Sequence, residues 1–232
     1  VQFAFRDFSF SWNIILTTFR IGLPASLSFV VMSLGQMLYN RIIVYFGSDA
    51  VAGVGVGMRL DQLFFLPIMA LASSLITIIG MLYGAKRIDL MRSTYLYVIR
   101  SGQMIAVVLG LLFYLISPYF MKIFSSDPLI IDIGTSYLRF NVFAYPFIVV
   151  GMISGRVFQG FGKGLPGLLI TTIRIAVIIV PLALLFTRVF EWDVQSVFVA
   201  QIISSFIAAT IAYFWLSSSM QRLKTEAIIP GE

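Results

Sequence analysis

The sequence contains neither cysteine nor histidine among its 232 residues. Without these two residue types, disulfides, thiol nucleophiles, zinc sites and haem ligation are excluded. A proton relay cannot use imidazole and would have to use carboxylates. No pairing of a nucleophile with a base is recognisable either. We therefore predict that the chain is not an enzyme, and we identify no catalytic residue, no metal site and no cofactor.

Charge is also scarce, because charged residues make up 11% of the chain and hydrophobic residues 59%. A soluble domain of this size could not hide so much apolar surface. The apolar residues form six long stretches, at 19–46, 50–84, 93–116, 129–155, 165–186 and 194–216. Each is long enough for a helix to cross the hydrocarbon core, where the backbone must satisfy its own hydrogen bonds. The sequence thus predicts an all-α, polytopic membrane protein with a bundle of six transmembrane helices.

The net charge of +6 reflects basic residues placed near the ends of these stretches, which favours contact with membrane lipid and gives no indication of nucleic acid binding. Alternate connections are rich in Lys and Arg, namely Arg6, Arg20, Lys86, Arg87, Arg92, Arg100, Arg156, Lys163, Arg222 and Lys224. The other connections hold only Lys122 and Arg188 beside acidic residues. Since basic short loops stay in the cytoplasm, we expect both ends of the chain to be cytoplasmic.

The stretches divide the chain into three predicted parts. Residues 1–18 form an aromatic-rich segment, expected to be a linker or to lie in the membrane interface. Residues 19–217 form the six-helix lobe, and residues 218–232 form a cytoplasmic tail. Because the chain opens on Val1 without a methionine, we interpret it as part of a longer protein.

Prolines and glycines interrupt the predicted helices. Four prolines stand at least one helical turn inside an apolar stretch and are expected to kink it: Pro24, Pro67, Pro146 and Pro181. Several kinked helices in one bundle are typical of transporters. Glycines at every second position, Gly53, Gly55 and Gly57, are expected to loosen the start of the second helix and not to form a tight helix–helix seam.

Ionisable and amide side chains deep in the apolar stretches are costly in lipid and often functional. The candidates for a substrate-binding or cavity-lining surface are Gln36, Asn40, Arg59, Asp61, Asn141, Tyr145 and Arg174. A structural alternative is an interhelical ion pair of Asp61 with Arg139 or Arg174. The deep arginines outnumber Asp61, which favours compensating carboxylates or an anionic ligand from outside this chain.

Four phrases occur in order along the chain: Gly22–Ala25 (GLPA), Gly57–Pro67 (GMRLDQLFFLP), Ile79–Ala85 (IGMLYGA) and Gln159–Gly162 (QGFG). Together they resemble the C-terminal six-helix lobe of the multidrug and toxic compound extrusion (MATE) family. The resemblance implies a twelve-helix transporter of the inner or plasma membrane, made with an N-terminal six-helix lobe. It also implies export of a small organic, usually cationic, substrate by alternating access in exchange for Na⁺ or H⁺.

This sequence departs from the family pattern at one point that concerns the coupling ion. Many members carry a glutamate about eight residues after the Gly-Leu-Pro proline, where this chain has Met32. The aspartate that often partners it is also missing, and Asn141 stands in the region. The resemblance therefore implies that Na⁺ or H⁺ is bound mainly by the N-terminal lobe. Two alternatives stay open: a lobe of a related lipid-linked oligosaccharide flippase, and a non-transporting scaffold or half-size subunit.

The absence of cysteine makes the predicted orientation directly testable. Single variants Ser48→Cys and Ser126→Cys should react with a membrane-impermeant maleimide applied to intact cells, because their loops are expected outside. Arg87→Cys and Lys163→Cys should react only after the membrane is permeabilised. The reverse labelling pattern would invert the topology.

Overall fold

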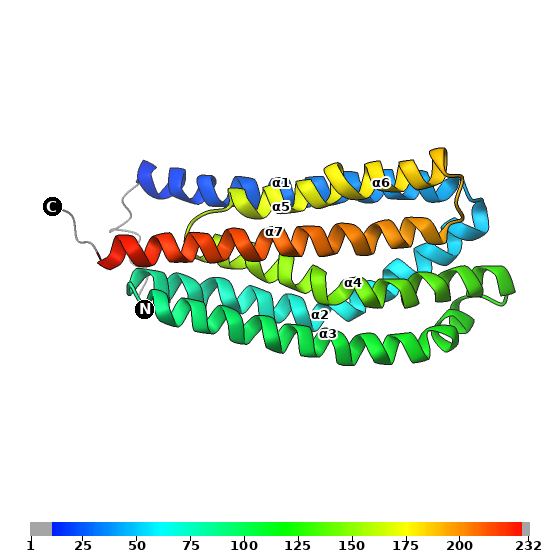
Figure 1. Cartoon of the computed structure of the whole chain (residues 1–232), viewed down its shortest axis with the longest axis horizontal. Helices are drawn as coiled ribbons and strands as arrows, with labels where there is room; N and C mark the ends of the chain where they lie inside the picture. The colour runs from blue at the N-terminus through cyan, green and yellow to red at the C-terminus, as the bar shows by residue number, and fades with distance from the viewer. Residues whose placement is uncertain (1–10, 229–232) are drawn as a thin grey trace, which may run out of the picture.

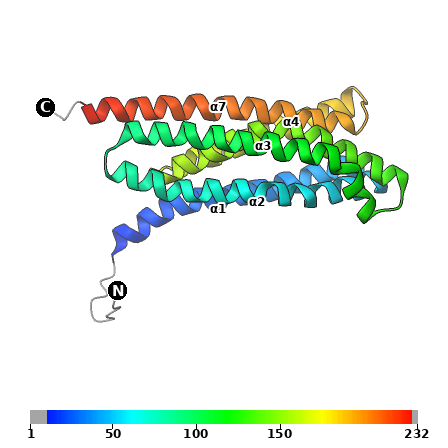
Figure 2. The same cartoon turned by 90° about the horizontal axis from the view of Figure 1, so that it is seen from below.

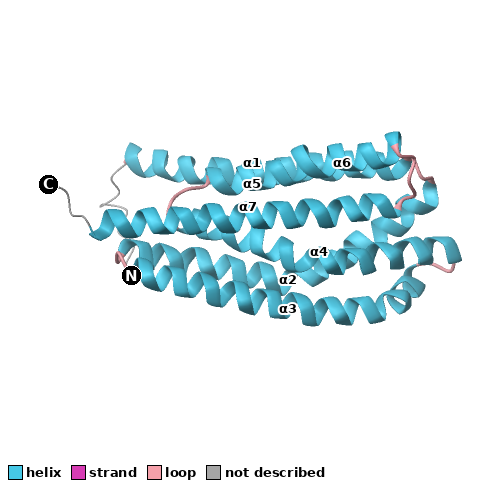
Figure 3. Ribbon diagram, in the orientation of Figure 1, coloured by secondary structure: helices cyan, strands magenta, loops and turns pink. Residues whose placement is uncertain are grey.

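The structure of the protein, a computed structural model, describes residues 11–228, and Figure 1 shows its helical spans running along the long axis. The spans are α1 (Trp12–Val44), α2 (Ser48–Gly84), α3 (Ile88–Phe124), α4 (Pro128–Gly160), a composite fifth span (Leu165–Val189) and α7 (Gln195–Ile228). All six are long and apolar enough to cross a membrane. Across the described residues, Figure 3 shows only helices and connecting loops. The predicted all-α, six-span fold is confirmed.

Several helices extend beyond the predicted stretches. Helix α1 begins at Trp12, so residues 12–18 of the predicted interfacial segment continue the first helix. Helix α3 is longer than 93–116 at both ends, and α7 continues to Ile228 inside the predicted tail. The apolar stretch marks the part of a helix that lipid surrounds, whereas the backbone ladder continues until a residue breaks it. Residues 1–10 and 229–232 of the predicted end segments lie outside the described residues.

Two connections show how the sequence ends these helices. Gly47 takes a φ of 99° in the turn between α1 and α2, a conformation that glycine adopts without steric cost. Asp127 caps α4 by accepting a hydrogen bond from the backbone N–H of Leu129 over 2.8 Å, and Pro128 occupies the first helical position. The loops can therefore stay short, which keeps consecutive spans antiparallel.

The fifth span is the least regular one. It consists of α5 (Leu165–Thr172), a π-helical segment η2 (Ile173–Ile179), α6 (Val180–Leu184) and a second π-helical segment η3 (Leu185–Val189). Pro181 has no N–H to donate, and its ring would clash with the carbonyl group four residues earlier. Widening of the preceding turns relieves this clash, and Val180 N–H accordingly donates to the Ile175 carbonyl, five residues back. The predicted proline distortion thus takes the form of π-helix.

Helix α4 is the centre of the bundle, since its most extensive contacts are with α2, α3 and α7. In Figure 1, α1 and the fifth span lie on one side of α4 and α7, and α2 and α3 lie on the other. Figure 2 shows the first turns of α1 leaving the bundle, and the buried residues of α1 are all in its second half. The beginning of α1 and the end of α7 share one end of the molecule (Figure 1).

Glycines bring α2 and α4 into very close contact, which corrects the prediction that no seam would form. A Cβ on Gly53 would lie 2.8 Å from the backbone oxygen of Ile130, and one on Gly134 would lie 2.9 Å from the backbone oxygen of Gly53. Gly57 packs in the same way under the ring of Tyr137. Gly53 and Gly57 are four residues apart and share a helix face, whereas Gly55 faces open space. The pair is a GxxxG seam of the kind that joins membrane helices.

This seam predicts a contrast between two neighbouring glycines. Gly53→Ala should destabilise the protein by about 1–3 kcal/mol, because the added methyl group meets backbone that cannot move without separating the helices. Gly55→Ala is the matched control and should be neutral or stabilise the helix by up to about 1 kcal/mol. Thermal unfolding of the purified variants in detergent measures both. Equal stabilities of the two variants would contradict the seam.

Candidate functional site

Asp61 lies on the side of α2 that faces α4, and its carboxylate accepts three hydrogen bonds. The Tyr137 hydroxyl donates to Oδ2 over 2.8 Å, and Asn141 Nδ2 donates to the same oxygen over 2.9 Å. The Tyr145 hydroxyl donates to Oδ1. The three donors stand at four-residue intervals on α4, and therefore on one face of that helix. We call these four residues the Asp61 cluster.

Aromatic rings surround the Tyr145 end of the cluster. Tyr145 is fully buried and stacks on Phe64, with ring centroids 3.8 Å apart and planes inclined by 23°. The ring of Phe65 meets Tyr145 edge-on. In such apolar surroundings, hydrogen bonds to a charged group gain strength, and an unpaired one is costly. Asn141 Oδ1 is buried and has no partner among the described residues, so the cluster keeps one free acceptor.

No cation accompanies the Asp61 carboxylate in the described part of the chain, and the structural alternative of an ion pair with Arg139 or Arg174 is wrong. Arg139 stands two residues before Asn141, on a different face of α4, and turns to α3. Its guanidinium lies 5.0 Å from the centre of the Tyr114 ring, and its Nε donates to the Tyr114 carbonyl over 3.5 Å. Asp61 is thus held by neutral donors only.

Arg174 belongs to a second polar region, a cavity of about 100 Å³ between α1, α2, α4, η2 and α7. Its lining comprises Met32, Gly35, Gln36, Tyr39, Met58, Tyr137, Arg174, Ile175, Ile179 and Gln201. The Gln36 side-chain amide donates to the sulfur of Met58 at 2.7 Å, a weak acceptor for an amide. Arg174 itself makes no hydrogen bond or ion pair within residues 11–228.

The sequence-predicted site residues therefore separate into groups. Asp61, Asn141 and Tyr145 form one cluster, and Gln36 and Arg174 line one cavity. Asn40 and Arg59 are exposed and belong to neither. Arg59 stands two residues before Asp61, so a regular helix turns it about 200° away.

Tyr137 is the functional candidate that the sequence analysis missed. Its hydroxyl donates to Asp61 while its side chain lines the Arg174 cavity, so it connects the two regions. The signal was present in the sequence, because Tyr137 continues the four-residue spacing of Asn141 and Tyr145. Tyrosine is common in membrane helices as a packing or interface residue, however, and the spacing gains meaning only opposite a carboxylate.

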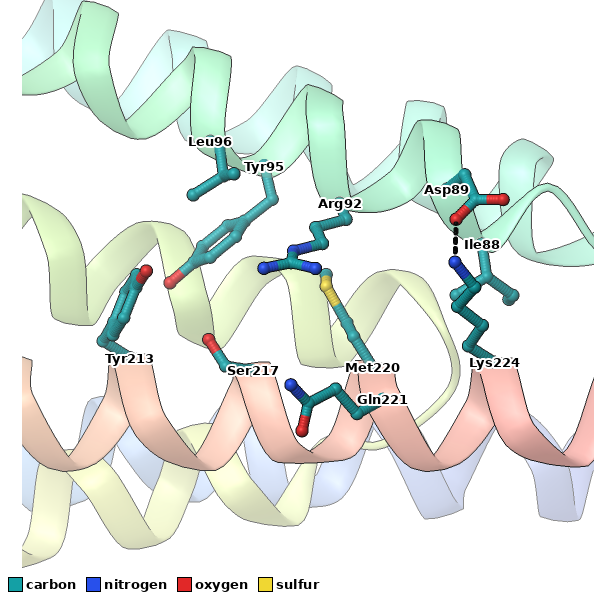
Figure 4. A pocket seen from close by; sticks show the side chains of 10 residues that line it. All are labelled: Ile88, Asp89, Arg92, Tyr95, Leu96, Tyr213, Ser217, Met220, Gln221 and Lys224. Atoms are coloured by element: carbon teal, nitrogen blue, oxygen red, sulfur yellow. Dashed lines mark ion pairs between the residues drawn. The ribbon is translucent and has the colours of Figure 1, made fainter.

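A smaller hollow of about 40 Å³ lies between α3 and α7, near the end of the molecule where α7 finishes (Figure 4). Lys224 and Asp89 form an ion pair across it over 2.9 Å, and both side chains are exposed. Exposed pairs of this kind are screened by water and salt. Among the described residues, no three His, Cys, Asp or Glu side chains gather closely enough to hold a metal ion.

Comparison with known proteins identifies the family of this six-helix bundle. The model of the MatE family matches residues 24–185, well over half of the chain. The chain belongs to the MatE family. It is 24% identical over 216 residues to a probable multidrug resistance protein NorM of Thermotoga maritima, covering 91% of this chain and 46% of that protein. It is 26% identical over 197 residues to the multidrug export protein MepA of Staphylococcus haemolyticus, covering 84% and 43%.

Solved MATE structures show the same architecture over half their length. A MOP superfamily transporter from Pyrococcus furiosus, described as having a binding pocket of reversed polarity, superposes with a TM-score of 0.92 at 27% identity. The match covers 97% of this chain and 50% of that one. A MATE structure in a bent conformation superposes with a TM-score of 0.91, and the match covers 98% of this chain and 50% of that one. The chain is thus a multi-pass membrane protein from a family of transporters, not enzymes, and spans about half the length of the relatives it matches.

The Asp61 cluster predicts a specific stability effect. Tyr145→Phe keeps the stacking on Phe64 but removes the donor to Oδ1, so it should cost about 1.5–3 kcal/mol, the scale for hydrogen bonds to charged groups. Tyr114→Phe is the matched control, because Tyr114 contacts Arg139 through its ring and its backbone carbonyl only. Thermal unfolding of both variants in detergent checks this. A Tyr145→Phe variant as stable as Tyr114→Phe would show that the carboxylate does not need this donor.

Proposed function

We propose that this chain is the C-terminal six-helix lobe of an ion-coupled multidrug efflux antiporter that works by alternating access. The observation that carries the proposal is the superposition of 97% of this chain on 51% of a multidrug resistance MATE family transporter, with a TM-score of 0.92. The remaining half would be an N-terminal six-helix lobe. On this proposal the transporter lies in the cell membrane, and both ends of this chain are cytoplasmic.

The exposed face of α1 supports a second lobe as the partner. Only Gly35, Tyr39, Ile42 and Ile43 of its 33 residues are buried, although most of the helix is apolar. Most other helices of the lobe are anchored through larger buried faces, as α4 is through thirteen residues. We propose that the first half of α1 lies between lipid and the N-terminal lobe, at the wall of a central cavity that the two lobes share.

The Asp61 cluster supports a cationic substrate. An acidic side chain without a cation among the described residues provides a favourable place for positive charge, and the nearby aromatic rings can stabilise organic cations through their faces. We propose that Asp61, Asn141 and Tyr145 line the substrate path, together with Tyr137. Gln36 and Arg174 would line a separate side cavity of the lobe, and the exposed Asn40 and Arg59 would face the central cavity.

The coupling ion, Na⁺ or H⁺, is proposed to bind mainly in the N-terminal lobe. Met32 replaces the family glutamate, and its thioether cannot hold Na⁺ or carry a proton. This lobe would contribute movement, for which its distorted helices are suited. Pro24, Pro67 and Pro146 each interrupt a backbone ladder, and π-helical segments such as η2 often mark functional sites. The flippase and scaffold alternatives gain no support from the relatives in Thermotoga maritima and Staphylococcus haemolyticus, which are both described as multidrug proteins.

Asp61→Asn in the complete transporter, meaning this chain with its N-terminal lobe, tests the proposal. The asparagine keeps an acceptor oxygen, and its new N–H can use the free Asn141 Oδ1, so folding should be preserved. Efflux of ethidium from cells should fall about tenfold, equivalent to about 1.4 kcal/mol of lost interaction. Asp132→Asn, at an exposed position near the start of α4, is the matched control and should transport normally.

Two further measurements separate the possible results. The thermal stability of Asp61→Asn should stay close to that of the unaltered protein, and the chain reconstituted without an N-terminal lobe should show no efflux. Normal efflux by Asp61→Asn would remove Asp61 from the substrate path. A loss of folded protein as large as the loss of efflux would make its role structural, and efflux by the isolated chain would favour a half-size transporter.

A further inference from the structure

The Arg174 cavity is unusual for the interior of a membrane protein because it holds a cation without an anion. Arg174 is half-buried and forms no ion pair or hydrogen bond within residues 11–228. No carboxylate lines the cavity, since Asp61 lies behind Tyr137. A charged side chain in these surroundings normally has a partner or faces water. The cavity walls therefore leave the positive charge uncompensated at short range.

The other polar groups around the cavity are also available as donors. Tyr39 is 7% exposed, and its hydroxyl has no hydrogen-bond partner among the described residues. The Gln36 amide has only the Met58 sulfur, and the Gln201 side chain has no hydrogen bond within the same residues. A buried hydroxyl without a partner is rare in folded proteins and indicates a missing water or ligand. Here it lines the same cavity as the unpaired arginine.

From this combination we propose that the Arg174 cavity binds one compact anionic group, a halide, a carboxylate or a phosphate. Arg174 supplies the charge, and the Tyr39 hydroxyl and the amides of Gln36 and Gln201 supply further hydrogen bonds. A volume of about 100 Å³ is several times what one water molecule requires, so a small anion fits with or without a water. A cation is excluded by Arg174, and a large apolar ligand by size.

The local structure of the fifth span contributes to this site. Arg174 is the second residue of η2, whose π-helical turns precede Pro181. Ile175 and Ile179 of the same segment are buried and form part of the apolar wall of the cavity. Gly35 of α1 faces Ile175 so closely that a Cβ would collide with it. The site therefore depends on the close approach of α1 to η2, and the residues that line it here all belong to this chain.

Asp61 adds a charge dependence that distinguishes this site from a water-filled void. Its carboxylate lies across Tyr137 from the cavity and must oppose an anion there through the poorly screening interior. Removing this negative charge should therefore strengthen anion binding. A purely structural cavity filled with water has no such dependence.

Equilibrium binding to the purified protein in an uncharged detergent tests the proposal. Chloride, acetate and inorganic phosphate are titrated at constant ionic strength, with the bulky anion gluconate as the background. A ligand that binds the folded state raises the thermal midpoint with its concentration, and calorimetric titration gives the affinity directly. At least one of the three anions should give a saturable effect. If none does, the proposal is overturned.

Three variants assign the effect to the cavity. Arg174→Gln should weaken the affinity at least tenfold, whereas Arg139→Gln, which removes a deep arginine outside the cavity, should bind normally. Tyr39→Phe should weaken the anion affinity about fivefold. It should leave the stability measured without anion unchanged, because the hydroxyl has no partner among the described residues. This variant tests the site even if Arg174→Gln fails to fold. Asp61→Asn should strengthen the anion affinity several-fold. Unchanged affinity in both Arg174→Gln and Tyr39→Phe would overturn the proposal.

One further comparison identifies the source of the anionic group. Short-chain phosphatidylglycerol and phosphatidylcholine are titrated below their micellar concentrations. Binding of phosphatidylglycerol at concentrations far below those of the free anions, abolished in Arg174→Gln, would assign the site to a lipid phosphate. Free anions binding as well or better would assign it to small ions. The assay measures binding without transport, so its outcome is independent of whether the efflux proposal holds.

Discussion

The close contact between α2 and α4 is the interaction on which the rest of the lobe depends. Gly53 and Gly57 have no side chain that would keep the two backbones apart, and Gly134 has the same effect on the α4 side of the contact. Only because the helices approach so closely can Asp61 reach three donors on a single face of α4. Helix α4 then has its other faces free for α3 and α7, which places it at the centre of the bundle.

The deep charges are accommodated in three different ways, which explains how so apolar a protein tolerates them. Asp61 has no cationic partner among the described residues, and its carboxylate accepts hydrogen bonds from hydroxyl and amide groups. Arg139 rests on the face of an aromatic ring and on a backbone carbonyl. Arg174 opens into a cavity. The contacts of Arg139 are made within the lobe, whereas Asp61 keeps a negative charge and Arg174 a positive charge that a ligand can use.

The distorted fifth span and the exposed first half of α1 lie on the same side of the molecule (Figure 1). This side is held to α4 and α7 by fewer contacts than α2 and α3 are. A lobe with one tightly seamed half and one loosely attached half can bend without unpacking its core, since π-helical turns and prolines already interrupt the backbone ladder there. On the efflux proposal, this division would let one part of the lobe bend while the other keeps its packing.

The sequence alone determined the class of the protein, because six long apolar stretches with few charges have one stable solution in lipid. It also located Asp61, Asn141, Tyr145 and Arg174, since deep polar residues are rare enough to be conspicuous. The tertiary structure decided their partners: Tyr137 joined the Asp61 cluster, the expected ion pair did not form, and Gly53 proved to be part of a seam. Periodicity within one helix gives the face on which a side chain stands. It does not say which other helix that face meets, because the packing of six similar apolar helices is settled by small differences in shape and by the few polar contacts they can make.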